Sequence, residues 1–235
     1  MTSLIKIERT QNFVQITLQA PERRNALDPA MIDCITEVAC EANDASVLLL
    51  QGSGCTFCAG FDVHLMRQAP DSVDVLIAAL SQACRALRRC SATVVVDVQG
   101  AAVAGGCALA MSADVVIARR GARLGYPVHA LGISPAVTLP VLIPAADGLA
   151  RTMVMNGRLH SAESLASHGV VHHLLDANDD ISQIIDPLLQ RGQHAAHVTK
   201  QWLNTLDGSW DDERFDGPVE GSRGLRIRAQ DSPES

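Results

Sequence analysis

The chain has 235 residues, of which 47% are hydrophobic, so it can bury a sizeable core in one large domain. Its formal net charge of −7 argues against a nucleic acid as the main partner, because phosphate binding needs a concentrated basic face. We find no apolar run long enough to span a bilayer and no leader-like N-terminus, so we expect no membrane partner and a cytoplasmic location.

The seven cysteines predict no disulfide framework and no metal site. Most of them lie within apolar patterns, which is typical of reduced core thiols in the cytoplasm. Cys55 and Cys58 form a C-x-x-C pair, but no second pair and no histidine cluster at zinc spacing follows.

The first half of the chain predicts alternating strands and helices. Residues 4–8 and 13–18 alternate apolar and polar side chains, as expected for two strands of a hairpin. Asp28 followed by Pro29 predicts a helix N-cap and first helical position. The later patterns predict a buried strand over 46–52, a helix over 72–89, a buried strand over 93–98, a small-residue helix from 104 and a strand over 114–118. This repeat predicts an α/β domain with parallel strands.

The second half is less regular. After Leu124, proline and glycine alternate with apolar residues, which favours loops and short helical turns. The remaining patterns predict helices over 147–156, from 161, over 181–190 and over 195–206, and a short strand over 170–175.

We divide the chain into one domain over residues 1–206 and a tail. The core of the domain lies in about 1–157, and about 158–206 form a helical C-terminal part. Residues 207–235 are polar, charged and rich in glycine and proline, so we expect a disordered or loosely attached tail.

Two glycine-rich loops each follow a predicted buried strand. The first spans 52–62, and the second, AVAGGCALAM, spans 102–111. Loops at the carboxyl ends of parallel strands can converge on one ligand. Gly105 lacks a Cβ and opens a predicted helix, so its N–H can be aimed at a developing negative charge. Close packing of the helix is the alternative explanation of the Gly105–Gly106 pair.

Five phrases resemble, in order and spacing, the enoyl-CoA hydratase/isomerase, or crotonase, superfamily over about residues 5–205. They are PERRNAL, FCAGFD, QGAAVAGGCALAMSADVVIA, LGYPVHALGISP and GRLHSAESLASHGVV. The resemblance implies a crotonase-like spiral of stacked ββα units with a helical C-terminal part. It also implies a thioester substrate of coenzyme A or of an acyl carrier protein, and an oxyanion hole made by the backbone N–H groups of Phe61 and Gly105.

The resemblance also suggests how the carrier is held and how the chain assembles. PERRNAL is similar to the segment that lies along the nucleotide of coenzyme A, so Arg23, Arg24 and Ala26 are candidates for that contact, with merely exposed arginines as the alternative. Coenzyme A would enter as part of the substrate, with no permanently bound cofactor. The family implies a homo-oligomer, a trimer or hexamer with C-terminal helices at the contacts, although the chain after Leu206 lacks the apolar helical pattern of those helices.

The sequence departs from the family at the catalytic acids. Hydratases of the family use two glutamates, and the matching positions hold Ala108 and Val128, while a third carboxylate position of other members falls near Ala136. Since these residues transfer no proton, we do not expect paired-glutamate hydration. His129, next to Val128, is the candidate acid–base group, or else a polar residue at the pocket mouth. Tyr126 is a candidate donor to a substrate oxygen, or else a packed ring.

Two functions therefore stay open. The first is an enzyme that holds an enolate without the usual glutamates, as a decarboxylase- or isomerase-like lyase; decarboxylation fits best, because loss of CO₂ needs only an electron sink. The second is a catalytically degenerate member that binds acyl-CoA. A dinucleotide-binding protein is a weaker option, because no G-x-G-x-x-G followed by an acidic residue occurs.

Overall fold

The computed structural model describes residues 4–225. Its main sheet has one antiparallel pair, the first two strands, and is otherwise parallel. The strand order is β1 (Ile5–Arg9), β2 (Phe13–Leu18), β3 (Val47–Gly52), β4 (Thr93–Val98), β6 (Val115–Arg119) and β9 (His173–Leu175). The α/β class with mainly parallel strands that the sequence predicts is confirmed.

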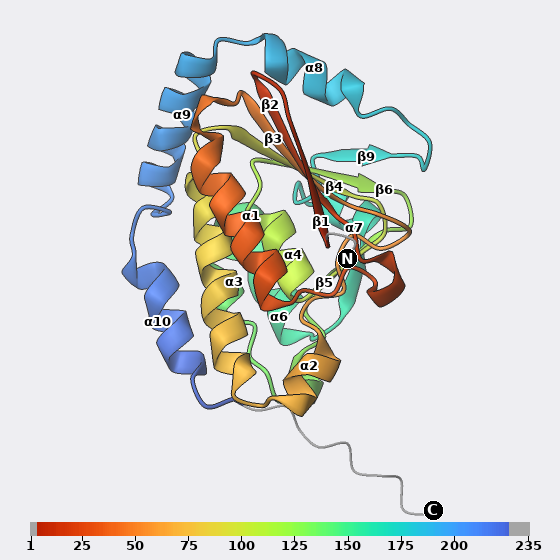
Figure 1. Cartoon of the computed structure of the whole chain (residues 1–235), viewed down its shortest axis with the longest axis vertical. Coiled ribbons are helices and arrows are strands. Elements are labelled where there is room, and N and C mark those ends of the chain that lie inside the picture. Colours follow the sequence, from red (N-terminus) through yellow and green to blue (C-terminus); the bar gives the residue numbers. More distant parts are fainter. Residues whose placement is uncertain (1–3, 226–235) are drawn as a thin grey trace, which may run out of the picture.

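Helices cover both faces of this sheet (Figure 1). The helices are α1 (Pro29–Glu41), α2 (Val63–Gln68), α3 (Ser72–Arg89), α4 (Gly105–Met111), α5 (Leu139–Ala146), α6 (Ala150–Met155), α7 (Ala162–Ser167), α8 (Ser182–Gln190), α9 (Gln193–Leu206) and α10 (Glu213–Ser222). Short 3₁₀ turns include η3 (His129–Leu131) and η4 (Ala136–Thr138).

The central strands are buried on both faces, as their unbroken apolar runs predict. Leu48 and Val94 face the larger core under α1, α3 and α4. Leu49 and Val95, one residue further along each strand, face a smaller cluster that includes Ile185 of α8. The strict alternation of side chains along a strand therefore divides these residues between two cores.

Two helix N-caps predicted from the sequence are present. The Asp28 carboxylate accepts a hydrogen bond from the Met31 N–H at 2.9 Å and starts α1. The Ser161 hydroxyl accepts from the Ser164 N–H at 3.2 Å and starts α7.

A second, small sheet was not predicted. It joins β5 (Ala101–Val103), β7 (Arg123–Gly125) and β8 (Leu159–Ser161). Each strand has only three residues, which is too short for a period of two to stand out in the sequence. Its strand β5 leads directly to Gly105, so the small sheet sets the direction from which the chain enters α4.

The structure defines two of the irregular segments. Residues 139–146 form α5, a short helical stretch of the kind expected after Leu124, with Pro140 in its first turn, where a missing N–H is tolerated. The predicted loose tail is wrong over 213–222, where α10 forms and buries Phe215 completely. Residues 226–235 of that tail lie outside the described part of the chain.

The stretch Ala136–Met155 is long and apolar enough, by length and composition, to cross a bilayer. This differs from the expectation that no run reaches that length. Half of its most apolar window is buried inside the protein, as in a core helix.

Helix α9 is attached through polar groups. The buried Lys200 ammonium donates to the Asp114 carboxylate at 2.6 Å and to the Ala92 carbonyl at 2.9 Å. One turn later, the buried Asn204 amide donates to the Arg88 carbonyl at 2.9 Å. The inner face of α9 is therefore held by directional bonds rather than by apolar packing.

We predict that Lys200→Met lowers the free energy of unfolding by about 2–3 kcal/mol, because it leaves the Asp114 carboxylate largely buried without its cation. Urea unfolding at neutral pH measures the change. Gln201→Met, at the exposed neighbouring position, is the control and should change little. A Lys200→Met protein as stable as the wild type would contradict the prediction.

Candidate active site

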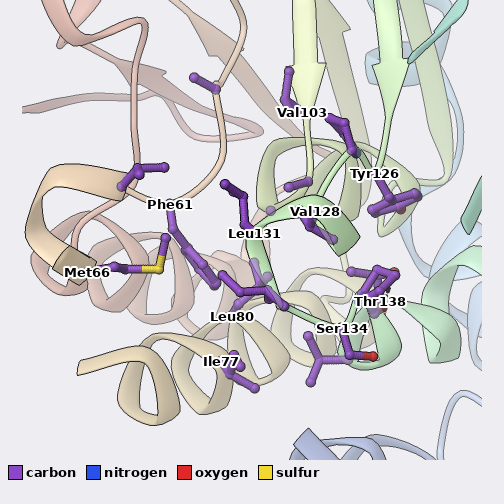
Figure 2. Close-up of a pocket in the computed structure, with 18 residues that line it drawn as sticks. Phe61, Met66, Ile77, Leu80, Val103, Tyr126, Val128, Leu131, Ser134 and Thr138 are labelled. Atoms are coloured by element: carbon purple, nitrogen blue, oxygen red, sulfur yellow. Dashed lines mark hydrogen bonds between the residues drawn. The ribbon is translucent and has the colours of Figure 1, made fainter. Parts of the chain in front are cut away.

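A cavity of about 220 Å³ lies between α2, α3, both glycine loops and the segment 126–138. Figure 2 shows Phe61, Met66 and Leu80 on one side of it and Tyr126 and Thr138 on another. An engineered protein cavity of roughly 150 Å³ holds benzene, so this one can take a group somewhat larger than benzene. Its walls are almost entirely apolar.

The first glycine loop brings Phe61 to this cavity. The Leu27 N–H donates to the Gly60 carbonyl at 2.7 Å, and the Asp62 N–H donates to the Leu27 carbonyl at 3.0 Å. These two bonds flank Phe61 and hold its backbone in place. Within residues 4–225, the Phe61 N–H itself has no hydrogen-bond acceptor.

The second loop brings Gly105 to the same cavity. The preceding residue, Ala104, has a φ of 50° and a ψ of −110°, a strained conformation for a residue with a Cβ. Its N–H donates to the Gly125 carbonyl at 2.8 Å, which holds the strained residue against the small sheet. Gly105 then begins α4, and in the described chain its N–H lacks an acceptor.

Backbone hydrogen bonds join the two loops. The Cys58 N–H donates to the Ala101 carbonyl at 3.1 Å, and the Val103 N–H donates to the Cys58 carbonyl at 2.9 Å. A Cβ on Gly106 would lie 2.5 Å from the Cys58 carbonyl oxygen, so only glycine fits there. Of the glycine pair, Gly106 serves close packing and Gly105 lines the cavity.

Asn25 stabilises the first glycine loop through its side-chain amide, a role that we did not predict. Its buried side-chain amide donates to the carbonyls of Ser53 and Thr56 at 2.9 and 2.8 Å, and its amide oxygen accepts from the Ala20 N–H at 2.9 Å. Its φ of 53° suits an asparagine better than most other residues. An asparagine inside a predicted loop was the available signal, since this side chain often replaces backbone partners in turns.

Arg23 is held by carboxylates rather than free. It pairs with Asp28 at 2.8 Å and with Asp62 at 3.0 Å. Burial alone would raise the pKa of Asp62, but two N–H groups of α2 and the Arg23 guanidinium outweigh it and keep that pKa below its usual range. Arg23 therefore ties its own loop to the start of α2.

Arg24 and Ala26 lie beside the first glycine loop. The Arg24 carbonyl accepts from the Ala59 N–H at 3.0 Å, while the residue itself is exposed and forms no ion pair within the described chain. Ala26 is buried, and Leu27 after it bonds to the loop at Gly60. The segment predicted to contact coenzyme A is thus hydrogen-bonded to the first glycine loop, which contributes residues to the cavity lining.

The position of His129 does not support the predicted acid–base role. Its side chain is exposed, and it is not among the residues that line the cavity. Its neighbour Val128 is buried and lines the cavity instead. Adjacent residues of a turn point in different directions, so sequence proximity to a pocket position did not place His129 in the pocket.

Tyr126 is one of the residues that line the cavity. The residue is fully buried, and its hydroxyl lies beside the Cys107 thiol and the Thr138 hydroxyl without hydrogen-bond geometry to a partner in the described chain. Burial, and then the neighbouring Cys107, raise the pKa of Tyr126 well above its ordinary value. The phenol therefore stays neutral, and its role as a donor to a substrate oxygen stays a prediction.

The cavity lining carries few groups for proton transfer. Among the described residues that line it, the polar side chains are the phenol of Tyr126 and the hydroxyls of Ser134 and Thr138, and none carries a carboxylate, imidazole, amine or thiol. Val128 lines the wall, whereas Ala108 and Ala136 are not part of the lining. This arrangement can hold a negatively charged oxygen with backbone donors, and Tyr126 is the one titratable side chain among these lining residues.

Several known proteins are similar to this chain in sequence. The family described as enoyl-CoA hydratase/isomerase matches residues 8–213. The chain is 29% identical over 208 residues to a probable enoyl-CoA hydratase of Mycobacterium bovis, covering 85% of this chain and 80% of that protein. It is 29% identical over 221 residues to a 1,2-epoxyphenylacetyl-CoA isomerase of Escherichia coli, covering 88% and 84%.

Solved structures share the fold. A crystal structure of an enoyl-CoA hydratase from Mycobacterium avium subsp. paratuberculosis superposes with a TM-score of 0.84 at 20% sequence identity. The match covers 94% of this chain and 93% of that one.

We predict that Asn25→Ala lowers the free energy of unfolding by about 2–4 kcal/mol, since it leaves buried backbone groups unpaired at both ends of the amide. Thermal and urea unfolding measure the loss. Asn25→Gly tolerates the positive φ and should still be destabilised, which separates lost hydrogen bonds from backbone strain. Asn43→Ala, at an exposed asparagine, is the control. Wild-type stability of both Asn25 variants would contradict the assignment.

Proposed function

The chain belongs to the enoyl-CoA hydratase/isomerase family, and on that premise we propose that it holds the carbonyl oxygen of an acyl-CoA thioester between the N–H groups of Phe61 and Gly105. One observation carries the proposal: two backbone N–H groups without acceptors in the described chain border one apolar cavity. Such a donor is worth roughly 3–4 kcal/mol to a developing oxyanion in comparable sites.

The reaction that fits this site is decarboxylation of an α-carboxyacyl thioester. The bond between the α-carbon and the carboxylate breaks, and its electron pair moves onto the thioester carbonyl to give an enolate while CO₂ leaves. The enolate carbon then takes a proton from water. No step needs a side-chain base, and the described residues that line the cavity include no carboxylate or imidazole. The apolar walls disfavour the compact charge of the carboxylate and so favour its spread towards the two N–H donors.

An isomerase-like reaction through the same enolate is the other form of this proposal. It requires removal of a proton from the acyl chain, and the cavity wall at Val128 carries no group that could accept one. We therefore place decarboxylation first.

The carrier would lie outside the cavity, along the segment that starts at Arg23. Arg24 is exposed and would meet a phosphate of coenzyme A, while Ala26, whose side chain is buried, would contribute only its backbone to the contact. Arg23, bound to two carboxylates, would orient the segment rather than bind the phosphates itself. An acyl carrier protein could deliver the same thioester. Coenzyme A is substrate here, and we propose no resident cofactor.

A catalytically degenerate acyl-CoA-binding protein is the second candidate. The observation that favours it is the same apolar lining, with Val128 where a carboxylate would be needed for hydration. Turnover separates the two candidates, because both predict binding.

We predict that malonyl-CoA or methylmalonyl-CoA is decarboxylated while crotonyl-CoA is not hydrated, as followed by chromatography of the thioesters. Since no lining group titrates near neutrality, kcat should stay level from about pH 6 to pH 9. His129→Ala is the control and should keep kcat within about twofold, because the side chain lies outside the cavity. Hydration of crotonyl-CoA at ordinary hydratase rates, or loss of activity in His129→Ala, would contradict the mechanism. Thioesters that raise the melting temperature but all survive incubation would favour the degenerate member.

We also propose a homo-oligomer, with the outer face of α9 at its contact. This face is apolar and exposed: Trp202 is 63% and Leu206 81% accessible. Other large apolar side chains near it are also exposed, namely Val198, Leu203 and Trp210. A helix with polar groups inside and apolar groups outside is a candidate contact surface, because exposed apolar patches mark such sites.

We predict that the wild type elutes as a trimer or hexamer in size-exclusion chromatography with light scattering. Trp202→Asp combined with Leu206→Asp should shift it to a smaller species, since each subunit would bring buried charge to the contact. Gln201→Asp, on the same helix, is the matched control. A monomeric wild type at micromolar concentration would rule out the assembly.

A further inference from the structure

Helix α10 cannot be stable by itself. Its ten residues, ERFDGPVEGS, include Gly217, Pro218 and Gly221, each of which disfavours a helix interior. Isolated helices of this length are marginal even with good helix formers. The helix therefore depends on what it docks against.

Charge supplies much of that docking. Arg89 of α3 pairs with Asp212 at 2.7 Å, and Arg85 pairs with Asp212 at 3.3 Å and also with Asp216. Between these two arginines, Arg88 pairs at 2.5 Å with Asp207, the C-cap residue of α9. Figure 1 shows α10 lying along α3.

A single large apolar side chain completes the contact. Phe215 is fully buried, with the guanidinium carbons of Arg85 and Arg89 at 5.1 and 5.5 Å from its ring centre. The Ser81 hydroxyl donates to the Phe215 carbonyl at 3.3 Å. The contact between α10 and α3 thus combines the ring of Phe215 with several charged contacts, whereas the contact between α1 and α3 is apolar.

The elements under α10 are walls of the cavity. α10 packs against α3 and η4. α3 contributes Ile77 and Leu80 to the cavity lining, and η4 contributes Val137 and Thr138. α10 therefore packs against the outer side of two cavity walls and contributes no residue to the cavity lining.

We propose that α10 is a detachable support of the acyl pocket, held on α3 by charge, and that its docking controls how tightly the pocket holds an acyl group. The identity of the pocket as an acyl site rests on the proposed function, whereas the docking by charge does not. The side chains of Asp212 and Asp216 are 64% and 63% exposed, so salt screens their ion pairs, while the buried core is not weakened in the same way.

Hydrogen exchange on the full-length protein tests the docking. Raising NaCl from about 0.1 M to 1 M shortens the Debye length from about 10 Å to 3 Å, and we expect amides of α10 to exchange about tenfold faster while those of β4 do not change. Asp212→Asn combined with Asp216→Asn should reproduce this at low salt. Glu220→Gln is the matched control, because that carboxylate pairs only with Arg223 in the described chain. If the exchange rate of the α10 amides changes neither with salt nor in the double variant, the proposal is wrong.

Calorimetry tests the link to the pocket. The ratio of the dissociation constants of free coenzyme A and butyryl-CoA isolates the acyl contribution, because both carry the same nucleotide. We expect this ratio to fall about threefold or more in the double variant and to stay unchanged in Glu220→Gln. An unchanged ratio together with faster α10 exchange would overturn control of the pocket. If neither compound binds the wild type, the proposed function and the pocket control both fail, and hydrogen exchange still decides whether charge holds α10.

Discussion

The geometry of the site depends on a pair of backbone hydrogen bonds through Cys58. They join the loop after β3 to the strand that leads into α4, and so hold Phe61 and Gly105 at one cavity. The approach is so close that Gly106 has no room for a Cβ, and Ala104 is held at a strained φ. Two segments more than forty residues apart thereby present unpaired N–H groups on a rigid frame.

The remaining polar side chains around the site support this frame. Asn25 replaces backbone partners for the first loop, and Arg23 ties its own segment to Asp62 at the start of α2. The lining is mostly apolar, and the Tyr126 phenol in it is neutral and has no hydrogen-bond partner in the described chain. Under the proposed function, such a site would stabilise charge on a substrate oxygen, and the proton would come from water.

Polar contacts have a second role at the C-terminal helices. α9 is held by Lys200 and Asn204, and α10 by ion pairs with the arginines of α3. Both helices are attached in part through polar contacts, in contrast to the apolar contact between α1 and α3. The apolar residues of α9 remain on its outside, available to another surface.

The sequence alone determined the elements whose signals are local or periodic, and with them the family. The alternating strands, the buried runs of β3 and β4 and the Asp28 cap follow from side-chain spacing within a few residues. Phe61 and Gly105 could be named because both loops carry specific phrases. Tertiary structure alone decided the rest. Phe215 of α10 is buried with the guanidinium groups of Arg85 and Arg89 near its ring, and these arginines lie far away in the chain. The outward turn of His129 and the unpaired hydroxyl of Tyr126 depend on packing across several elements, which no local pattern records.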